Sequence, residues 1–250
     1  MDMTRHKAGR RTLDFERQRK ETFVSTLAHE LRQPLSAMLA AVEVVRLESD
    51  SAAASRATDV MKRQIGQMNR VIDDLVDATR WACGKVTIQK QRLDVRDTVR
   101  DAALDVQAAL AGRGLELAVA TTSEPLWADA DPQRLQQVLS NLLRNAVKYT
   151  EPGGRISLAA ERHPAAVTLR VSDTGRGIEP EALLHIFDLF SQVRPSEAVG
   201  LGIGLSVVRE IVGLHKGRIE ARSEGLGHGS EFIVTLPLAP APGTLQHSPS

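Results

Sequence analysis

The sequence predicts a multidomain protein in which an α-helical hairpin is followed by an α+β two-layer sandwich, and three observations support this. Apolar residues recur at spacings of three and four over about the first eighty positions, which is the period of amphipathic helices. Near Gly84 this period changes to strand-like alternation. From there to residue 238, strand and helix patterns follow one another between short turns, as in an α+β layer.

Two amphipathic helices account for the N-terminal part. The first is expected over residues 14–46, the polar break LESDSAAAS follows, and Ser55 is a candidate N-cap for the second. The apolar stripes of the two helices consist of Val24, Leu27, Leu31, Leu35, Met38, Val42 and Val45, and of Met61, Ile65, Met68, Ile72 and Leu75. A lone hairpin would leave one side of this seam in water, so we expect a homodimer whose two copies form a four-helix bundle.

The elements of the second domain follow from local signals. An aspartate followed by proline, Asp131 and Pro132, predicts the N-cap and first position of a helix that continues through residues 135–148. Helices are also expected at 97–110, ending near Gly112 and Gly114, and at 204–214. Strands are expected within VTIQKQRLDV and at 115–120, 155–160, 166–172, 218–221 and 230–236.

These patterns divide the chain and exclude several classes of protein. We expect a basic tail over residues 1–14, a helical domain over 15–84, an α+β domain over 86–238 and a disordered tail over 239–250. The net charge of +1 gives no reason to expect nucleic-acid binding. No apolar run is long enough to span a membrane, so a cytoplasmic chain is expected. With Cys83 as the only cysteine, an intrachain disulfide is excluded.

His29 is the first candidate for chemistry. It lies between Leu27 and Leu31 of the apolar stripe, so its side chain is expected beside the seam and facing solvent. Neutral imidazole offers a nitrogen lone pair near pH 7 and needs little activation as a nucleophile. Glu30 could orient the ring, and Pro34 removes the backbone donor that would bond the carbonyl of Glu30. Taken alone, this pattern also fits an ordinary exposed histidine–glutamate pair.

The longer string His-Glu-Leu-Arg-Gln-Pro-Leu on this helix resembles the acceptor box of sensor histidine kinases. The resemblance covers about seventy residues and implies that His29 is the phosphoacceptor, with Glu30 and Gln33 as further catalytic residues. Gln33 departs from the family pattern, in which Thr or Asn is more common. In the family this residue is associated with positioning a water that dephosphorylates the receiver.

The second domain carries a polar face on its helix at 135–148. Asn141, Asn145 and Lys148 are spaced four and three residues apart and therefore share one side of the helix. Amide oxygens there can ligate Mg²⁺, and the Lys148 ammonium can neutralise phosphate charge. Two lone asparagines would otherwise be read as an ordinary polar helix face.

Three further blocks follow this helix in order. In VSDTGRGIEP a strand runs into a glycine turn, where the Asp173 carboxylate can accept from the adenine amino group while Gly175 and Gly177 permit close approach. Phe187 and Phe190 come next in HIFDLFSQV. In VGLGIGLSVV, Gly200, Gly202 and Gly204 with Leu205 lead into a helix whose free backbone donors suit an anion. No Lys-Ser/Thr pair follows, so this is not a Walker loop.

Four blocks in this order resemble the ATP-binding domain of histidine kinases, which is of the GHKL (Bergerat) type and is similar to that of type II topoisomerases and mismatch-repair ATPases. The resemblance implies that Asn145 ligates Mg²⁺, with Asn141 beside it. It also implies that Lys148 and Tyr149 face the phosphates of ATP and that Asp173 binds adenine. The phenylalanines would form the family's phenylalanine box.

Together these resemblances imply a two-component protein histidine kinase. It would bind ATP and Mg²⁺ and transfer the γ-phosphoryl group to His29 of the same or the partner subunit. The phosphoryl group would then pass to an aspartate of a separate response regulator receiver domain. A rival interpretation is a non-catalytic dimeric nucleotide-binding scaffold, favoured by the short segment between Phe190 and Gly200. An ATPase or serine kinase with the same nucleotide fold would leave the His29 hairpin unexplained.

Overall fold

The structure is a computed structural model that describes residues 3–47, 51–82, 87–191 and 202–241. The chain divides into two compact units. The first contains Met1–Gly84 together with Asp188–Gly204, and the second contains Lys85–Phe187 together with Leu205–Ser250. The single cysteine, Cys83, and the end of the C-terminal tail from residue 242 lie outside the described residues.

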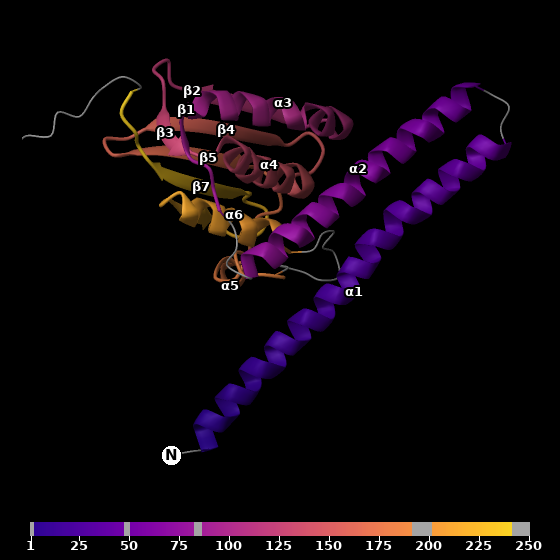
Figure 1. The fold of residues 1–250 in the computed structure, drawn as a ribbon, viewed down its shortest axis with the longest axis horizontal. Coiled ribbons are helices and arrows are strands. Elements are labelled where there is room, and N and C mark those ends of the chain that lie inside the picture. The colour runs from indigo at the N-terminus through magenta and orange to yellow at the C-terminus, as the bar shows by residue number, and fades with distance from the viewer. Residues whose placement is uncertain (1–2, 48–50, 83–86, 192–201, 242–250) are drawn as a thin grey trace, which may run out of the picture. The chain divides into compact units, whose positions relative to one another are not determined.

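The first unit is a hairpin of two long helices, α1 (Met3–Leu47) and α2 (Ser51–Ala82), which pack against each other (Figure 1). Both begin earlier than the sequence pattern predicts. Helix α1 extends to Met3 because the residues before Asp14 lack proline and are rich in good helix formers. Helix α2 starts at Ser51 rather than after Ser55, and the intervening alanines favour the helical state. Within the described residues, no helix combines the length and the apolar character needed to cross a membrane.

The hairpin leaves much of its apolar stripe in water. Val24, Leu35 and Val42 on α1 are exposed, as are Ile65 and Ile72 on α2. The fully buried apolar side chains of the hairpin include the small Ala41 and Ala57, whereas these five larger ones remain exposed. Contiguous exposed apolar surface of this kind marks an interaction site. It is the surface that the predicted second copy would cover.

The second unit is an α+β two-layer sandwich, which confirms the predicted fold class (Figure 1). Its main sheet has the strand order β2-β4-β5-β7-β6, with β2 and β4 parallel and the other neighbours antiparallel. These strands are β2 (Glu116–Thr121), β4 (Arg155–Arg162), β5 (Ala166–Asp173), β6 (Arg218–Arg222) and β7 (Ser230–Pro237). Helices α3 (Val95–Arg113) and α4 (Pro132–Tyr149) pack on this sheet.

Smaller elements complete the second unit. A separate antiparallel ladder joins β1 (Gln91–Asp94) to β3 (Trp127–Ala130), and β3 was not predicted from the sequence. The remaining helices are the one-turn α5 (Pro180–Leu183) and α6 (Gly204–Leu214). At the start of the predicted C-terminal tail, the buried Ala239 donates its backbone N–H to the carbonyl of Trp127 at 2.8 Å.

Helix α4 has the start that the sequence predicts. The Asp131 carboxylate accepts hydrogen bonds from the backbone N–H groups of Gln133 (3.1 Å) and Arg134 (3.2 Å), and Pro132 occupies the first turn. The apolar face of the helix is buried against the sheet and α3. It consists of Leu135, Val138, Leu139, Leu142 and Leu143, at the spacing of one helix face. This burial fixes which side of α4 carries Asn145 and Lys148.

His215 links the end of α6 to the start of α4. Its ring is buried, with Nδ1 2.7 Å from the carbonyl of Ile211, while Nε2 accepts from the backbone N–H of Asp131 at 2.9 Å. The two residues of the second contact are 84 positions apart in the chain. Burial lowers the pKa of His215 because it disfavours the imidazolium, and the Lys90 charge acts in the same direction. The Ile211 carbonyl and the Asp131 carboxylate oppose this lowering of the pKa but do not reverse it.

We therefore predict that the second unit loses stability in mild acid. The pKa of His215 is lower in the folded state than in the unfolded chain, so the unfolded chain binds the proton more readily. The stabilisation is complete above an unfolded-state pKa of about 6.5 and is lost as the pH falls towards the folded-state pKa. Urea denaturation of the wild type between about pH 5 and 8 should show the free energy of unfolding falling below about pH 6.5.

The variant His215→Gln should flatten this pH dependence, because a neutral amide can still donate to Ile211 and accept from Asp131. We expect the variant to lower the free energy of unfolding by about 1 to 3 kcal/mol at pH 8, since glutamine reproduces the two hydrogen bonds of the histidine imperfectly. His228→Gln, at an exposed position, is the matched control and should retain the wild-type slope. An unchanged slope in His215→Gln would show that other groups cause the acid sensitivity.

Candidate functional site

The polar face of α4 is present as predicted. Asn141 is buried, and Asn145 and Lys148 are half-buried one and two turns further along the helix. The C-terminal end of the helix is held from α3, because Arg113 Nη1 donates to the carbonyls of Val147 (2.7 Å) and Lys148 (3.0 Å). The backbone that carries Lys148 is therefore positioned by two helices rather than one.

The two asparagines differ in their surroundings. Arg144 Nη2 donates to Asn141 Oδ1 at 2.6 Å, whereas the buried Asn141 Nδ2 has no hydrogen-bond partner within the described structure. A buried donor left unpaired costs about 1 to 3 kcal/mol, which an acceptor on a ligand would offset. This atom therefore fits a site that is completed by a bound molecule. The carbonyl oxygen of Asn145 is of the kind that Mg²⁺ prefers.

The described residues contain no cluster of three or more His, Cys, Asp or Glu side chains that could hold a metal ion by itself. A magnesium ion bound here would therefore depend on few protein ligands, with phosphate oxygens and water as the others. Mg²⁺ is commonly bound in this way in nucleotide sites. The residues present thus fit a Mg²⁺ that arrives with a nucleotide.

Two cationic side chains flank the ring of Tyr149. Lys148 Nζ donates to Tyr149 Oη at 2.7 Å, and the Arg176 guanidinium lies 4.2 Å from the centroid of the same ring. The backbone N–H of Arg176 also donates to the Tyr149 carbonyl at 3.1 Å. Arg176 was not predicted from the sequence, because the motif in its turn pointed to the glycines on either side of it. A charged residue between two such glycines was the available signal.

Asp173 is the last residue of β5 and is half-buried. Its Oδ1 accepts from the backbone N–H of Gly175 at 2.9 Å, and its Oδ2 accepts from Ser230 Oγ at 2.5 Å. Ser230 lies opposite Asp173 in the ladder of β5 and β7, a contact that the sequence analysis missed. The carboxylate is thereby oriented, and its remaining lone pairs can accept a further hydrogen bond.

The glycines of the turn after β5 are required by packing within the chain itself. A Cβ on Gly175 would lie 2.4 Å from the Tyr149 carbonyl oxygen, and one on Gly177 would lie 2.0 Å from that of Gly225. Gly177 also has a φ of +73°, which residues with a side chain rarely adopt. This close approach brings Asp173 and Tyr149, from different elements, to the same turn.

The phenylalanines and glycines of the last two sequence motifs are divided between the two units. Phe187 contacts Phe232 of β7 edge-on, with ring centroids 6.4 Å apart, so it also packs in the second unit. Phe190 has a φ of 63° and donates its N–H to the carbonyl of Gly202 at 3.1 Å. Phe190 and Gly202 both belong to the segment Asp188–Gly204 of the first unit. Gly204 and Leu205 begin α6, and the predicted Gly200 lies outside the described residues.

The predicted acceptor is accessible. His29 is exposed on α1, as the spacing predicts, whereas Glu30 is buried. The ring contact comes from Gln33, whose Nε2 lies 3.0 Å from His29 Nε2. With the amide nitrogen as donor, the Nε2 lone pair accepts and the ring proton is on Nδ1. Pro34 lies inside α1, which continues through it to Leu47.

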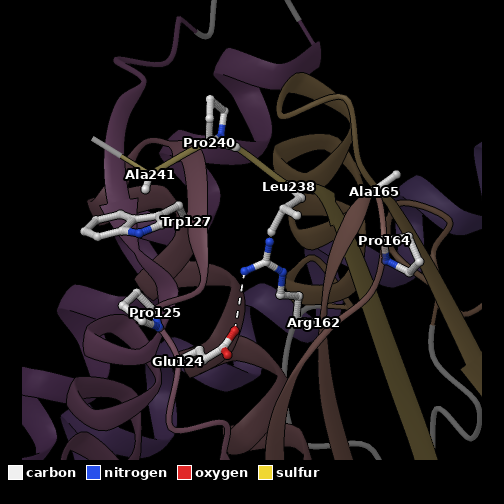
Figure 2. Close-up of a pocket in the computed structure, with 10 residues that line it drawn as sticks. Glu124, Pro125, Trp127, Arg162, Pro164, Ala165, Leu238, Pro240 and Ala241 are labelled. Atoms are coloured by element: carbon white, nitrogen blue, oxygen red, sulfur yellow. Dashed lines mark ion pairs between the residues drawn. The ribbon is translucent and has the colours of Figure 1, made fainter. Parts of the chain in front are cut away.

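A cavity of about 470 Å³ in the second unit lies away from these residues (Figure 2). Trp127, Pro125 and Pro240 line it, and Arg162 pairs with Glu124 across it at 3.7 Å. Both charged side chains are exposed by half or more, so their ion pair contributes little to stability. None of the predicted site residues lines this cavity.

Comparison with known proteins identifies both halves of the chain. The His Kinase A (phospho-acceptor) domain matches residues 19–84, and the histidine kinase-, DNA gyrase B- and HSP90-like ATPase matches residues 130–240. The adaptive-response sensory kinase SasA of Synechococcus elongatus is 35% identical over 229 residues, which cover 87% of this chain and 59% of SasA.

Solved structures agree with the sequence matches. Full-length ShkA in complex with AMPPNP has a TM-score of 0.65 and 29% identity, covering 87% of this chain and 46% of that one. The histidine kinase ThkA in complex with the response regulator TrrA shares the fold, with a TM-score of 0.62 and 20% identity over 91% of this chain and 66% of that one. The chain spans about half the length of SasA and ShkA. The chain therefore contains a histidine kinase phospho-acceptor domain and an ATPase domain of the histidine kinase, DNA gyrase B and HSP90 type, and its homologues include sensor histidine kinases.

Proposed function

We propose that this chain is a two-component histidine kinase core that phosphorylates its own His29 from ATP. The observation that carries the proposal is the combination of an exposed histidine in a phospho-acceptor domain with an ATPase domain in the same chain. In the reaction, a lone pair on an imidazole nitrogen forms a bond to the γ-phosphorus. The bond from that phosphorus to the oxygen of the leaving ADP breaks, and His29 is left as a phosphoramidate.

The residues of the second unit support specific roles in this reaction. The oriented Asp173 carboxylate accepts from the adenine amino group, and the Lys148 ammonium neutralises phosphate charge. Tyr149 holds Lys148 through its hydroxyl, and the Arg176 guanidinium lies over the Tyr149 ring. Asn145 would hold Mg²⁺, which supplies charge neutralisation when it is bound. The protein thus contributes mainly positioning and electrostatics.

The residues around His29 act on the nucleophile. The Gln33 amide holds the ring through Nε2, so this contact must open before Nε2 can attack phosphorus. Glu30, the other catalytic candidate next to His29, is buried on α1.

We propose domain limits of 15–84 for the acceptor domain and 86–238 for the nucleotide domain. The second is supported by Lys85–Phe187 forming part of one compact unit.

Two partners belong to the proposal. A second copy of the chain would cover the exposed apolar residues of α1 and α2 and complete a four-helix bundle. A response regulator would accept the phosphoryl group on an aspartate, supported by the likeness to ThkA, which was solved with the response regulator TrrA. We also propose that the reaction takes place in the cytoplasm, where ATP is available. The scaffold alternative lacks comparable support.

We predict that His29→Ala abolishes phosphoryl acceptance and leaves ATP binding intact, because the acceptor and the nucleotide residues belong to different units. Incubation with γ-labelled ATP should give the wild type an acid-labile and alkali-stable label, and the variant none. His185→Ala, an exposed histidine of the second unit, is the control and should be labelled normally. Label that persists in His29→Ala would refute the assignment, and an unlabelled wild type would favour the scaffold.

We predict that two substitutions weaken nucleotide binding by different routes. Asn145→Ala should reduce Mg²⁺-dependent ATP affinity by about tenfold or more, as loss of groups at metal sites commonly does. Asp173→Asn should reduce ATP affinity by about ten- to a hundredfold with or without Mg²⁺, because a charged acceptor is lost. Calorimetry is the measurement, with Gln136→Ala as an amide control on α4. Wild-type affinity in both variants would mean that the site is misplaced.

We predict that Gln33 makes the protein a weak phosphatase towards its phosphorylated receiver. Glutamine is one methylene longer than asparagine and would hold an attacking water less tightly, and a small misplacement can cost about a hundredfold in rate. Gln33→Asn should accelerate decay of the phospho-receiver without loss of His29 labelling. The comparison includes Gln33→Ala, which should show the lowest decay rate. A fast wild-type rate that Gln33→Asn lowers would contradict this expectation.

A further inference from the structure

One polar atom on α4 is left without a partner by the folded chain. Asn141 Nδ2 makes no hydrogen bond within the described residues, although only 6% of its residue surface is exposed. Burying an amide donor without an acceptor is unfavourable, and native structures contain few such atoms. Its persistence here is explained if a bound molecule supplies the acceptor.

The other end of the same amide is held by Arg144. This residue follows Asn141 by three positions, and its Nη2 donates to Asn141 Oδ1 at 2.6 Å. A guanidinium has only donors, so it can hold the amide oxygen but not the amide nitrogen. Rotating the Asn141 amide by half a turn would place its Nδ2 donor against the Arg144 Nη2 donor. Arg144 therefore keeps Nδ2 on the buried side and Oδ1 on its own side.

We propose that Arg144 is a positioning residue that fixes Asn141 as a hydrogen-bond donor to a phosphate oxygen of the bound nucleotide. This proposal rests on the proposed function and gives the two asparagines of α4 different roles. Asn145 offers its amide oxygen to Mg²⁺, whereas Asn141 offers its amide nitrogen to the nucleotide. Phosphate oxygens are the strong acceptors that ATP brings, and Lys148 on the same helix face is suited to the same groups.

Calorimetry with Mg²⁺ and AMPPNP on the full chain tests the proposal. Arg144→Ala should weaken binding by about tenfold, the range for one hydrogen bond that involves a charged partner. Adenosine carries no phosphate, so ligand-observed NMR should give it the same affinity for wild type and variant. Arg134→Ala, which removes another arginine of α4, is the matched control and should bind AMPPNP normally. A loss of adenosine affinity equal to that of AMPPNP would overturn the proposal.

A double-mutant cycle separates positioning from simple charge attraction. If Arg144 acts through the Asn141 amide, Asn141→Ala combined with Arg144→Ala should bind no more weakly than Asn141→Ala alone. If Arg144 instead attracts the phosphates by its charge, the two losses will multiply and the proposal fails. The melting temperature of nucleotide-free Arg144→Ala measures any structural role separately, and a small decrease is expected because Asn141 Oδ1 loses its partner. A lowered melting temperature with unchanged affinity would show a merely structural role and would also overturn it.

The outcome for the wild type distinguishes this inference from the proposed function. A wild-type chain that does not bind Mg²⁺ and AMPPNP would remove the proposed kinase activity itself. A wild-type chain that binds, together with an Arg144→Ala variant that binds equally well, would leave the proposed function in place and refute only the role of Arg144.

Discussion

The proposed nucleotide-binding residues of α4 depend on the anchoring of this helix at both ends. At its start, Asp131 caps the helix with its carboxylate while its own backbone N–H is bonded to His215. At its end, Arg113 of α3 holds the last carbonyls. Because the apolar face of α4 is buried between these anchors, the polar face has one orientation. The positions of Asn145 and Lys148 then follow from the helical repeat.

A second constraint is the turn after β5, which brings Asp173, proposed to bind adenine, close to Tyr149, proposed to face the phosphates. Gly175 lets this turn approach the Tyr149 carbonyl closely, and Arg176 contacts both the backbone and the ring of Tyr149. Asp173 is oriented by the same turn and by Ser230 of the neighbouring strand. A side chain at Gly175 would therefore disturb both ends of the proposed nucleotide site at once.

The acceptor hairpin follows a different rule from the nucleotide domain. A nucleophile has to remain accessible, and His29, the proposed acceptor, is exposed although Glu30 beside it is buried. The same hairpin leaves large apolar residues in water, while small residues such as Ala41 and Ala57 are buried in it. The second unit, in contrast, buries its core between helices and sheet within one chain. Within the described residues, most of the large exposed apolar side chains therefore lie on the hairpin.

By itself, the sequence determined the features that depend on neighbours along the chain. The Asp131 cap, the shared face of Asn141, Asn145 and Lys148, and the exposure of His29 follow from local spacing, because helix geometry relates residues a few positions apart. Strand β3 was not predicted, and the starts of α1 and α2 were placed too late in the sequence. The tertiary structure decided the contacts of Arg113, Arg176, Ser230 and His215, whose partners are far away in the sequence or on other elements. No periodic pattern records such contacts, since they arise only when separate elements pack together.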